Sequence, residues 1–183
     1  AAMIPIAFAD TEGSTCDALL PTGQVREAID GIEVTLLDNG MPVVVVGAAC
    51  YEGGVQAAYV HPPANKIGFL VQLDGGTPEL ARLLAMHISF AAPDYATRDD
   101  VPTEVVEAER QIYLNSDEVR SKPEAAREKI VDGMLGKRFF AASPGGVLAD
   151  QAWIHDQSTS VGAALAAAGA TLKGFKRVSV TGS

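Results

Sequence analysis

The 183-residue chain is long enough for one domain or two small ones, and its 48% hydrophobic and 20% charged content is typical of globular proteins. Its net charge of −9 argues against nucleic acid or an anionic membrane as the main partner, because both need clustered lysine and arginine. There is no apolar run of bilayer length and no basic-then-apolar leader, so we expect a cytoplasmic protein that does not bind membranes.

The charge is distributed unevenly along the chain. Residues 1–48 hold seven acidic residues and a single basic one, Arg26, and therefore carry −6 of the net −9. This shift in composition predicts a boundary that divides the chain into segments 1–48 and 49–183.

The first segment is predicted to be rich in strands. Met3–Ala9 is a short apolar run typical of a strand, and Pro5 within it favours a sheet edge. Gly31–Leu37 alternates apolar and polar residues, and Met41–Val46 is an almost wholly apolar run. Between these two runs, Asp38–Gly40 has the residue types of a tight turn, so we expect a β-hairpin here.

Two further strands and a helix are predicted next. The strands cover Glu52–His61 and Ile67–Leu73. Thr77 has the chemistry of a helix N-cap, with Pro78 at the first helical position, where a missing N–H costs nothing. The apolar face of this helix is predicted from its i, i+3, i+4 spacing: Leu80, Leu83, Leu84, His87 and Ile88. On this face His87 is predicted to be a core histidine with satisfied hydrogen bonds.

Two charged helical segments follow, and they are split at Ser121–Pro123. The first carries apolar residues at sevenfold spacing: Val105, Ile112 and Val119. The second opens with the spacing of a capping box, Ser121 to Glu124, and continues with apolar residues four apart: Ala126, Ile130 and Met134. Such narrow stripes joined by a short polar turn predict an antiparallel helical hairpin over about residues 100–140, which protrudes from a globular body and serves recognition better than catalysis.

The end of the chain is predicted to form a short helix and a closing strand. Ser158–Ala168 reads as a capped helix stopped at Gly169, and Thr171–Val180 alternates like a strand. Together these elements predict an α+β fold in which a small antiparallel sheet packs with helices and carries the protruding hairpin.

Two stretches of the first segment carry a family resemblance, Gly13–Gly23 and Gly31–Val44. Through them about residues 1–47 resemble a fragment of the 4-oxalomesaconate tautomerase family. The resemblance implies an isomerase fragment, although the family's proton-moving lysine and cysteine are expected upstream of the matched piece, and there is no lysine here before Lys66. Proton transfer next to a carbonyl needs a base and an acid on opposite faces. Cys16 alone does not supply them, so we interpret it as a structural or incidental thiol.

The second segment resembles another family. Its motifs are Ala85–Ile88, Pro93–Tyr95, Asp99–Pro102, Ile130–Leu135, Ser160–Gly162 and Phe175–Val178. In this order, over about residues 51–180, they are similar to the C-terminal core subdomain and coiled-coil arm of bacterial elongation factor Ts. The resemblance implies a nucleotide exchange factor for elongation factor Tu, which acts by protein contact and not as an enzyme.

The same resemblance implies three positions that contact elongation factor Tu: His61, Ile154 and His155. Two plainer readings stay open, namely that His61 is a solvated loop histidine and that His155 caps its loop. The family's Thr-Asp-Phe-Val motif has its nearest echo at Leu73–Thr77, which lacks the phenylalanine. The family's N-terminal helical domain is also not found here. We therefore expect weakened binding of elongation factor Tu and inefficient exchange.

Taken together, the two resemblances predict a non-catalytic chimera built on a truncated elongation factor Ts core. The alternatives are a binding module or weak exchange factor for elongation factor Tu and, less favoured, a tautomerase. No histidine or carboxylate pair has metal-ligand spacing, and Cys16 and Cys50 also lack it, so we expect neither metal nor cofactor. The paired glycines are predicted to form turns. A homodimer is left open.

Overall fold

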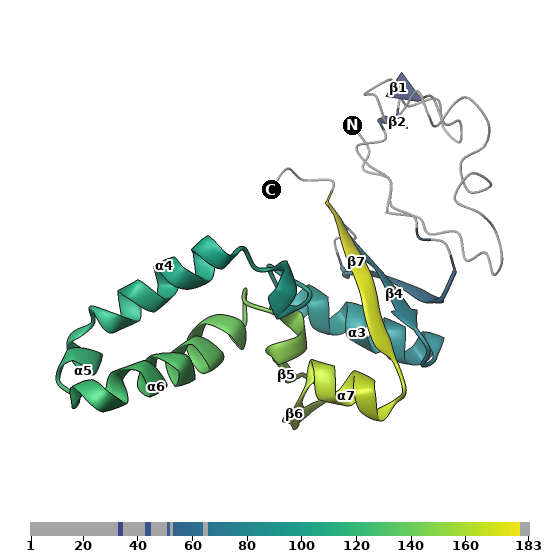
Figure 1. Ribbon diagram of the computed structural model, residues 1–183. Coiled ribbons are helices and arrows are strands. Elements are labelled where there is room, and N and C mark those ends of the chain that lie inside the picture. The colour runs from purple at the N-terminus through teal and green to yellow at the C-terminus, as the bar shows by residue number, and fades with distance from the viewer. Residues whose placement is uncertain (1–32, 35–42, 45–50, 52, 64–65, 180–183) are drawn as a thin grey trace. The chain divides into compact units, whose positions relative to one another are not determined.

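The computed structural model describes residues 33–34, 43–44, 51, 53–63 and 66–179. By its internal contacts the chain divides into two units. Unit 1 comprises residues 1–86 with 173–183, and unit 2 comprises residues 87–172. Helices combine with small antiparallel sheets, which confirms the predicted α+β class (Figure 1).

A three-stranded sheet with the order β3-β4-β7 is built from β3 (Val55–Val60), β4 (Ile67–Asp74) and β7 (Thr171–Ser179). Strands β3 and β4 pair antiparallel, from Val55 opposite Leu73 to Val60 opposite Gly68. Along β4 the buried side chains recur at every second position: Phe69, Val71 and Leu73. This period of two is that of a strand with one face in the core, and it confirms the predicted strands.

Helix α3 (Pro78–Ala91) begins as the sequence predicts, because the N–H of Leu80 donates to Oγ1 of Thr77 at 3.2 Å. Its buried face is the following set: Ala81, Leu84, Ala85, His87, Ile88 and Ala91. The prediction for Leu83 is wrong, since this side chain is 37% exposed. The buried face is centred on Leu84 and Ile88, and Leu83 lies about a third of a turn away.

The predicted helical hairpin is confirmed in unit 2. It consists of α4 (Thr103–Leu114), the short α5 (Asp117–Arg120) and α6 (Glu124–Met134), which continues into the π-helical segment η2 (Leu135–Phe140). Figure 1 shows α4 and α6 side by side and antiparallel, with α5 at the far end. Four buried side chains form the hairpin core: Val119, Val131, Met134 and Leu135.

The predicted stripe Val105, Ile112 and Val119 is right for Val119, which is buried in the hairpin core, and wrong for Ile112. Ile112 is 62% exposed, whereas Val106 and Tyr113, one position later in the same sevenfold spacing, pack against the hairpin core. Between them Arg110 reaches across to α6, where it pairs with Glu128 at 3.2 Å and Asp132 at 2.8 Å. The inner face of α4 is therefore part apolar and part ionic, which hides it from a search for apolar residues alone.

The predicted capping box between Ser121 and Glu124 is not formed. Pro123 occupies the N-cap position of α6 without a side-chain hydrogen bond, and the hydroxyl of Ser121 donates instead to the carbonyl of Glu118 at 2.9 Å. The cap lies earlier, at α5, where the oxygen of Ser116 accepts from the N–H of Val119. The short helix α5 consists of residues that the sequence assigned to the first helical segment, which in the structure already ends at Leu114.

The last part of unit 2 holds a small sheet that the sequence did not predict. Strands β5 (Ala152–Trp153) and β6 (Asp156–Ser160) pair antiparallel, and α7 (Val161–Ala167) follows directly. The predicted helix therefore starts three residues later than expected, since Ser160 caps it by accepting from the N–H of Ala163 at 3.2 Å. The predicted stop at Gly169 is confirmed by its positive φ of 65°.

Only short parts of the first 50 residues are described. Strands β1 (Glu33–Val34) and β2 (Val43–Val44) pair antiparallel, as the predicted hairpin requires. The predicted strand Met3–Ala9, the two cysteines and the boundary at residue 48 lie outside the described residues. Among the helices in the described ranges, none combines the length and the apolar character needed to cross a bilayer.

Candidate partner-binding turn

The residues predicted to bind a partner lie at two places in the structure. Ile154 and His155 are brought together as the two-residue connection between β5 and β6 in unit 2, which we call the contact turn. His61 belongs to unit 1, where it directly follows β3.

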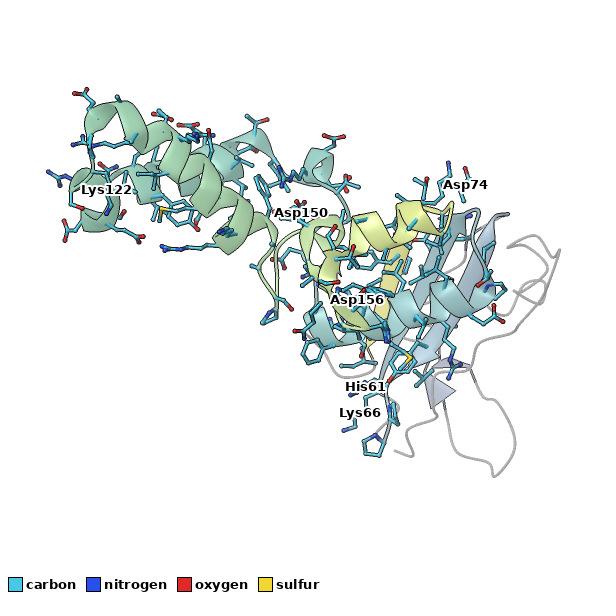
Figure 2. All side chains as sticks on the ribbon, turned by 90° about the horizontal axis from the view of Figure 1, so that it is seen from below. His61, Lys66, Asp74, Lys122, Asp150 and Asp156 are labelled. Atoms are coloured by element: carbon cyan, nitrogen blue, oxygen red, sulfur yellow. The ribbon has the colours of Figure 1, made fainter. Side chains whose placement is uncertain are left out.

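The contact turn presents one residue to solvent and keeps the other partly covered. His155 is exposed and Ile154 is half-buried. On the far side of the turn Asp156 accepts from the N–H of Ser158 at 3.0 Å and from its hydroxyl at 2.6 Å (Figure 2). These two hydrogen bonds lower the pKa of Asp156, so this carboxylate stays ionised and stabilises the start of β6.

Below the turn lies Trp153, which is only 6% exposed. Its indole stacks on the imidazole of His87 with ring centroids 5.3 Å apart and planes 27° apart. On its other side the ring of His155 approaches edge-on at 4.8 Å and 65°. Aromatic pairs prefer such offset and edge-to-face arrangements, so Trp153 couples an exposed histidine to a buried one.

His87 is fully buried, and both of its ring nitrogens have partners. Nε2 lies 3.0 Å from Oε1 of Gln151, and Nδ1 accepts from the backbone N–H of Ile154 at 3.3 Å. An acceptor at Nδ1 and a donor at Nε2 define one neutral tautomer. Burial lowers the pKa of His87, the hydrogen bond to Gln151 opposes that shift, and the charge of His155 adds to it. The predicted core histidine is confirmed.

Gln151 is the other fully buried polar side chain of this region. Its amide Nε2 donates to the carbonyls of Ala142 at 2.9 Å and Gly145 at 2.5 Å, which leaves Oε1 facing His87. Sequence reasoning missed this role. The signal was weak, because Gln151 follows the charged Asp150 and nothing local shows which of the two side chains is buried; an amide that is buried needs hydrogen-bond partners. We call His87, Gln151 and Trp153 the turn support.

Arg98, in the short helix η1 (Arg98–Asp100), connects the hairpin to the segment before the turn support. Its guanidinium donates to both carboxylate oxygens of Asp150 from Nε at 3.0 Å, and it lies 4.6 Å from the ring centroid of Phe140. The bidentate pair raises the pKa of Arg98 still further. Sequence reasoning missed this contact, because its two ends are 52 residues apart.

His61 lies at the loop end of the β3–β4 hairpin (Figure 2). Its backbone N–H donates to the carbonyl of Ile67 at 2.9 Å, and its Nδ1 lies 3.4 Å from the hydroxyl of Tyr59. The side chain is exposed, which suits either a contact residue or a solvated loop histidine. Both readings from the sequence therefore stay open.

The side chains of the contact turn are suited to binding a protein partner. Within the ranges that the structure describes, there is no group of three or more His, Cys, Asp or Glu residues that could hold a metal. The glycine pairs have positive φ, as predicted for turns: Gly53–Gly54, Gly75–Gly76 and Gly145–Gly146. An exposed imidazole and an aliphatic side chain, held on a buried support, offer apolar area and hydrogen bonding to a protein partner.

Comparison with known proteins matches the chain to a single protein family. The family Elongation factor TS matches residues 41–182. Elongation factor Ts of Streptomyces avermitilis is 37% identical over 178 residues, which cover 94% of this chain and 61% of that protein. The Azotobacter vinelandii protein of the same name is 37% identical over 176 residues, covering 95% of this chain and 57% of the relative.

These matches give no support to the predicted chimera. An alignment that covers 94% of the chain includes most of residues 1–47, so the same relatives account for the segment that was assigned to the tautomerase family. The chain spans 61% of the length of the Streptomyces relatives.

Proposed function

Because the chain belongs to the elongation factor Ts family, we propose that it binds elongation factor Tu and promotes the release of GDP from that GTPase in translation elongation. The observation that carries the proposal is the family match over residues 41–182, which includes the contact turn and its whole support. The net charge of −9 agrees with a protein partner and argues against nucleic acid.

The proposed mechanism is a difference in affinity and includes no covalent step. A factor that binds the nucleotide-free GTPase more tightly than the GDP-bound form lowers the affinity for GDP by the same ratio, because the two binding equilibria are linked. The chain needs only a surface that fits the nucleotide-free form. It acts without a metal or cofactor of its own.

We assign the contacts to Ile154 and His155, with His61 as a third position. The exposed imidazole of His155 packs edge-on against Trp153 and the backbone N–H of Ile154 is bonded to His87, so less conformational entropy is lost on binding. The aliphatic and aromatic character of the turn supplies area that can be desolvated at an interface.

Binding is expected to exceed exchange in this chain. The echo of the Thr-Asp-Phe-Val motif at Leu73–Thr77 forms the connection between β4 and α3. Its Asp74 lies 3.9 Å from the ammonium of Lys173 on β7, which competes for the carboxylate. This echo has Gly75 where the motif has its phenylalanine. We therefore propose a binder whose exchange activity is weak.

The test combines calorimetric titration of nucleotide-free elongation factor Tu with release of radiolabelled GDP from the GDP-bound form. Replacing Ile154 and His155 together by alanine is expected to weaken binding by about tenfold or more, a loss of about 1.4 kcal/mol. The matched control is Ala167→Ser at the exposed end of α7, with an affinity change of less than about twofold. An affinity unchanged in the double variant would refute the assigned contacts.

A further inference from the structure

The tautomer of His87 is fixed by a series of hydrogen bonds that begins in the interior of unit 2. The carbonyls of Ala142 and Gly145 accept from Nε2 of Gln151, and this orients the amide so that Oε1 faces the imidazole. An oxygen at that place requires a proton on Nε2 of His87. The lone pair of Nδ1 is consequently left for the N–H of Ile154.

The strand pairing beside the contact turn is short and irregular. Strand β5 has only two residues, and the register of β5 and β6 shifts between Ala152 and Trp153. Such a bulge interrupts the hydrogen-bond ladder and re-aims the residues beside it. The orientation of the contact turn therefore depends on the side chains packed against it. One of them is His87 of α3, 67 residues earlier, which accepts from the N–H of Ile154.

We infer that His87 is a positioning residue for partner binding, because its unprotonated Nδ1 sets the orientation in which Ile154 and His155 meet the partner. The inference rests on the proposed function. His87 is fully buried and touches no partner itself, so its effect passes through the bond to Ile154 and the stack on Trp153.

The arrangement requires a neutral imidazole. A proton on Nδ1 would place a donor against the donor N–H of Ile154 and break the bond. The titratable group that acts on His87 is His155, from the turn itself. Gln151 and Trp153, from the segments packed against the ring, carry no charge. Protonation of His87 therefore releases the contact turn.

Two variants separate the two nitrogens. In His87→Asn the side-chain oxygen stands near the place of Nδ1 and can accept from Ile154, but the side chain is too short to reach Gln151. In His87→Gln the amide N–H reaches the place of Nε2 and can donate to Gln151, but no acceptor remains for Ile154. Both variants exchange the ring for an amide and lose the stack on Trp153, so each is the matched control for the other.

The first measurement needs no partner. Hydrogen exchange of the Ile154 amide, followed by NMR, is expected to be at least about tenfold faster in His87→Gln than in His87→Asn. In the unmodified chain the same amide is expected to lose its protection as the pH falls and His87 becomes protonated. Equal exchange in both variants overturns the inference. If neither variant folds, an Ile154 amide whose protection does not follow protonation of His87 also overturns it.

The second measurement is the affinity for elongation factor Tu. We expect His87→Gln to bind at least about tenfold more weakly than His87→Asn. If the amide responds as expected and the two affinities are equal, the turn is positioned by His87 but positioning does not serve binding, and the inference is overturned. If the unmodified chain does not bind elongation factor Tu at all, the proposed function fails. The exchange of the Ile154 amide still shows in that case whether its bond to His87 holds the contact turn.

Discussion

The turn support and the helical hairpin are stabilised in opposite ways. In the turn support two fully buried polar side chains, His87 and Gln151, satisfy each other and two backbone carbonyls. In the hairpin the ion pairs reach solvent, and the bidentate pair of Arg138 with Glu118, for example, joins side chains that are half exposed. A buried group that loses its partner keeps its full desolvation cost, whereas an exposed group is solvated by water.

The comparison teaches that the number of polar contacts is a poor guide to their importance. The hairpin has more ion pairs than the turn support has hydrogen-bonded side chains, yet its stability rests on the four residues of its apolar core. The turn support depends on a single chain of donors and acceptors. The following predictions separate these two cases, and we begin with the largest effect.

Replacing Gln151 by leucine tests the turn support most directly. The variant leaves the fully buried Nε2–H of His87 and the partly buried carbonyls of Ala142 and Gly145 without these partners, so we expect a loss of about 3 kcal/mol in the free energy of unfolding. Urea denaturation measures it. The control Gln157→Leu, at an exposed position of β6, should change stability by less than about 0.5 kcal/mol. Equal losses in the two variants would contradict the assignment.

Replacing Val131 by alanine tests the hairpin core. The side chain is one of the four of the hairpin core and is fully buried, so we expect a cavity that costs about 2 kcal/mol. Denaturation together with faster amide exchange in α4 and α6 would show it. Ile112→Ala is the comparison, because a side chain that is 62% exposed should contribute less than about 0.5 kcal/mol. A larger loss from Ile112 would mean that the inner face of α4 is misassigned.

The pH dependence of stability isolates His87. Burial lowers its folded pKa below the ordinary value of 6.5, so between these two values the unfolded chain binds more protons than the folded one. The free energy of unfolding is therefore expected to fall as the pH drops through 6.5, by at most about 1.4 kcal/mol per pH unit. His87→Asn should remove this part of the slope. An unchanged slope in that variant would assign the pH dependence to other groups.

Gly133→Ala should stabilise the hairpin. A Cβ at this helical position meets no atom within 4 Å, and alanine in place of glycine favours a helix by about 0.5–1 kcal/mol. Gly54→Ala is the opposite case, since φ is +68° and the added Cβ would lie 2.5 Å from the carbonyl oxygen of Leu73. Thermal unfolding should move up in the first variant and down in the second. A destabilised Gly133→Ala variant would show that the space beside Gly133 is not open to a Cβ.

The smallest effect is expected for Arg110→Met, which keeps most of the aliphatic stem and removes the ionic contacts with Glu128 and Asp132. The loss should be about 0.5 kcal/mol at low salt, because exposed pairs contribute little. It should disappear near 1 M salt, where the Debye length is about 3 Å. A loss that persists at high salt would show that packing of the stem, and not charge, is the main contribution.

Elements with a strong local pattern were predictable from the sequence. The N-cap of α3 and the hairpin over residues 103–140 follow from residue types and spacing that act within a few turns of helix. The pattern failed where a charged residue replaces an apolar one on an inner face, as Arg110 does in α4. A search for periodic apolar residues then selects the neighbouring stripe of the helix, which is exposed.

The candidate site was predictable only in part. Ile154 and His155 were named through the family resemblance, and His87 was placed in the core, but nothing local connects them. Strand β5 has two residues and β6 is polar throughout, so neither shows a period-two pattern. The bond from Ile154 to His87 spans 67 residues, and the pair of Arg98 with Asp150 spans 52. Contacts of this range depend on the packing of the whole unit.

The stack between Trp153 and His87 makes the chain its own spectroscopic probe. The sequence contains a single tryptophan, and it lies in the turn support, so all indole fluorescence originates there. A charged imidazole is an efficient quencher of an indole at this separation, whereas a neutral one is not. The emission of the unmodified chain therefore responds to the charge of both neighbouring imidazoles, His87 and His155, and comparison with His155→Ala isolates the part that belongs to His87.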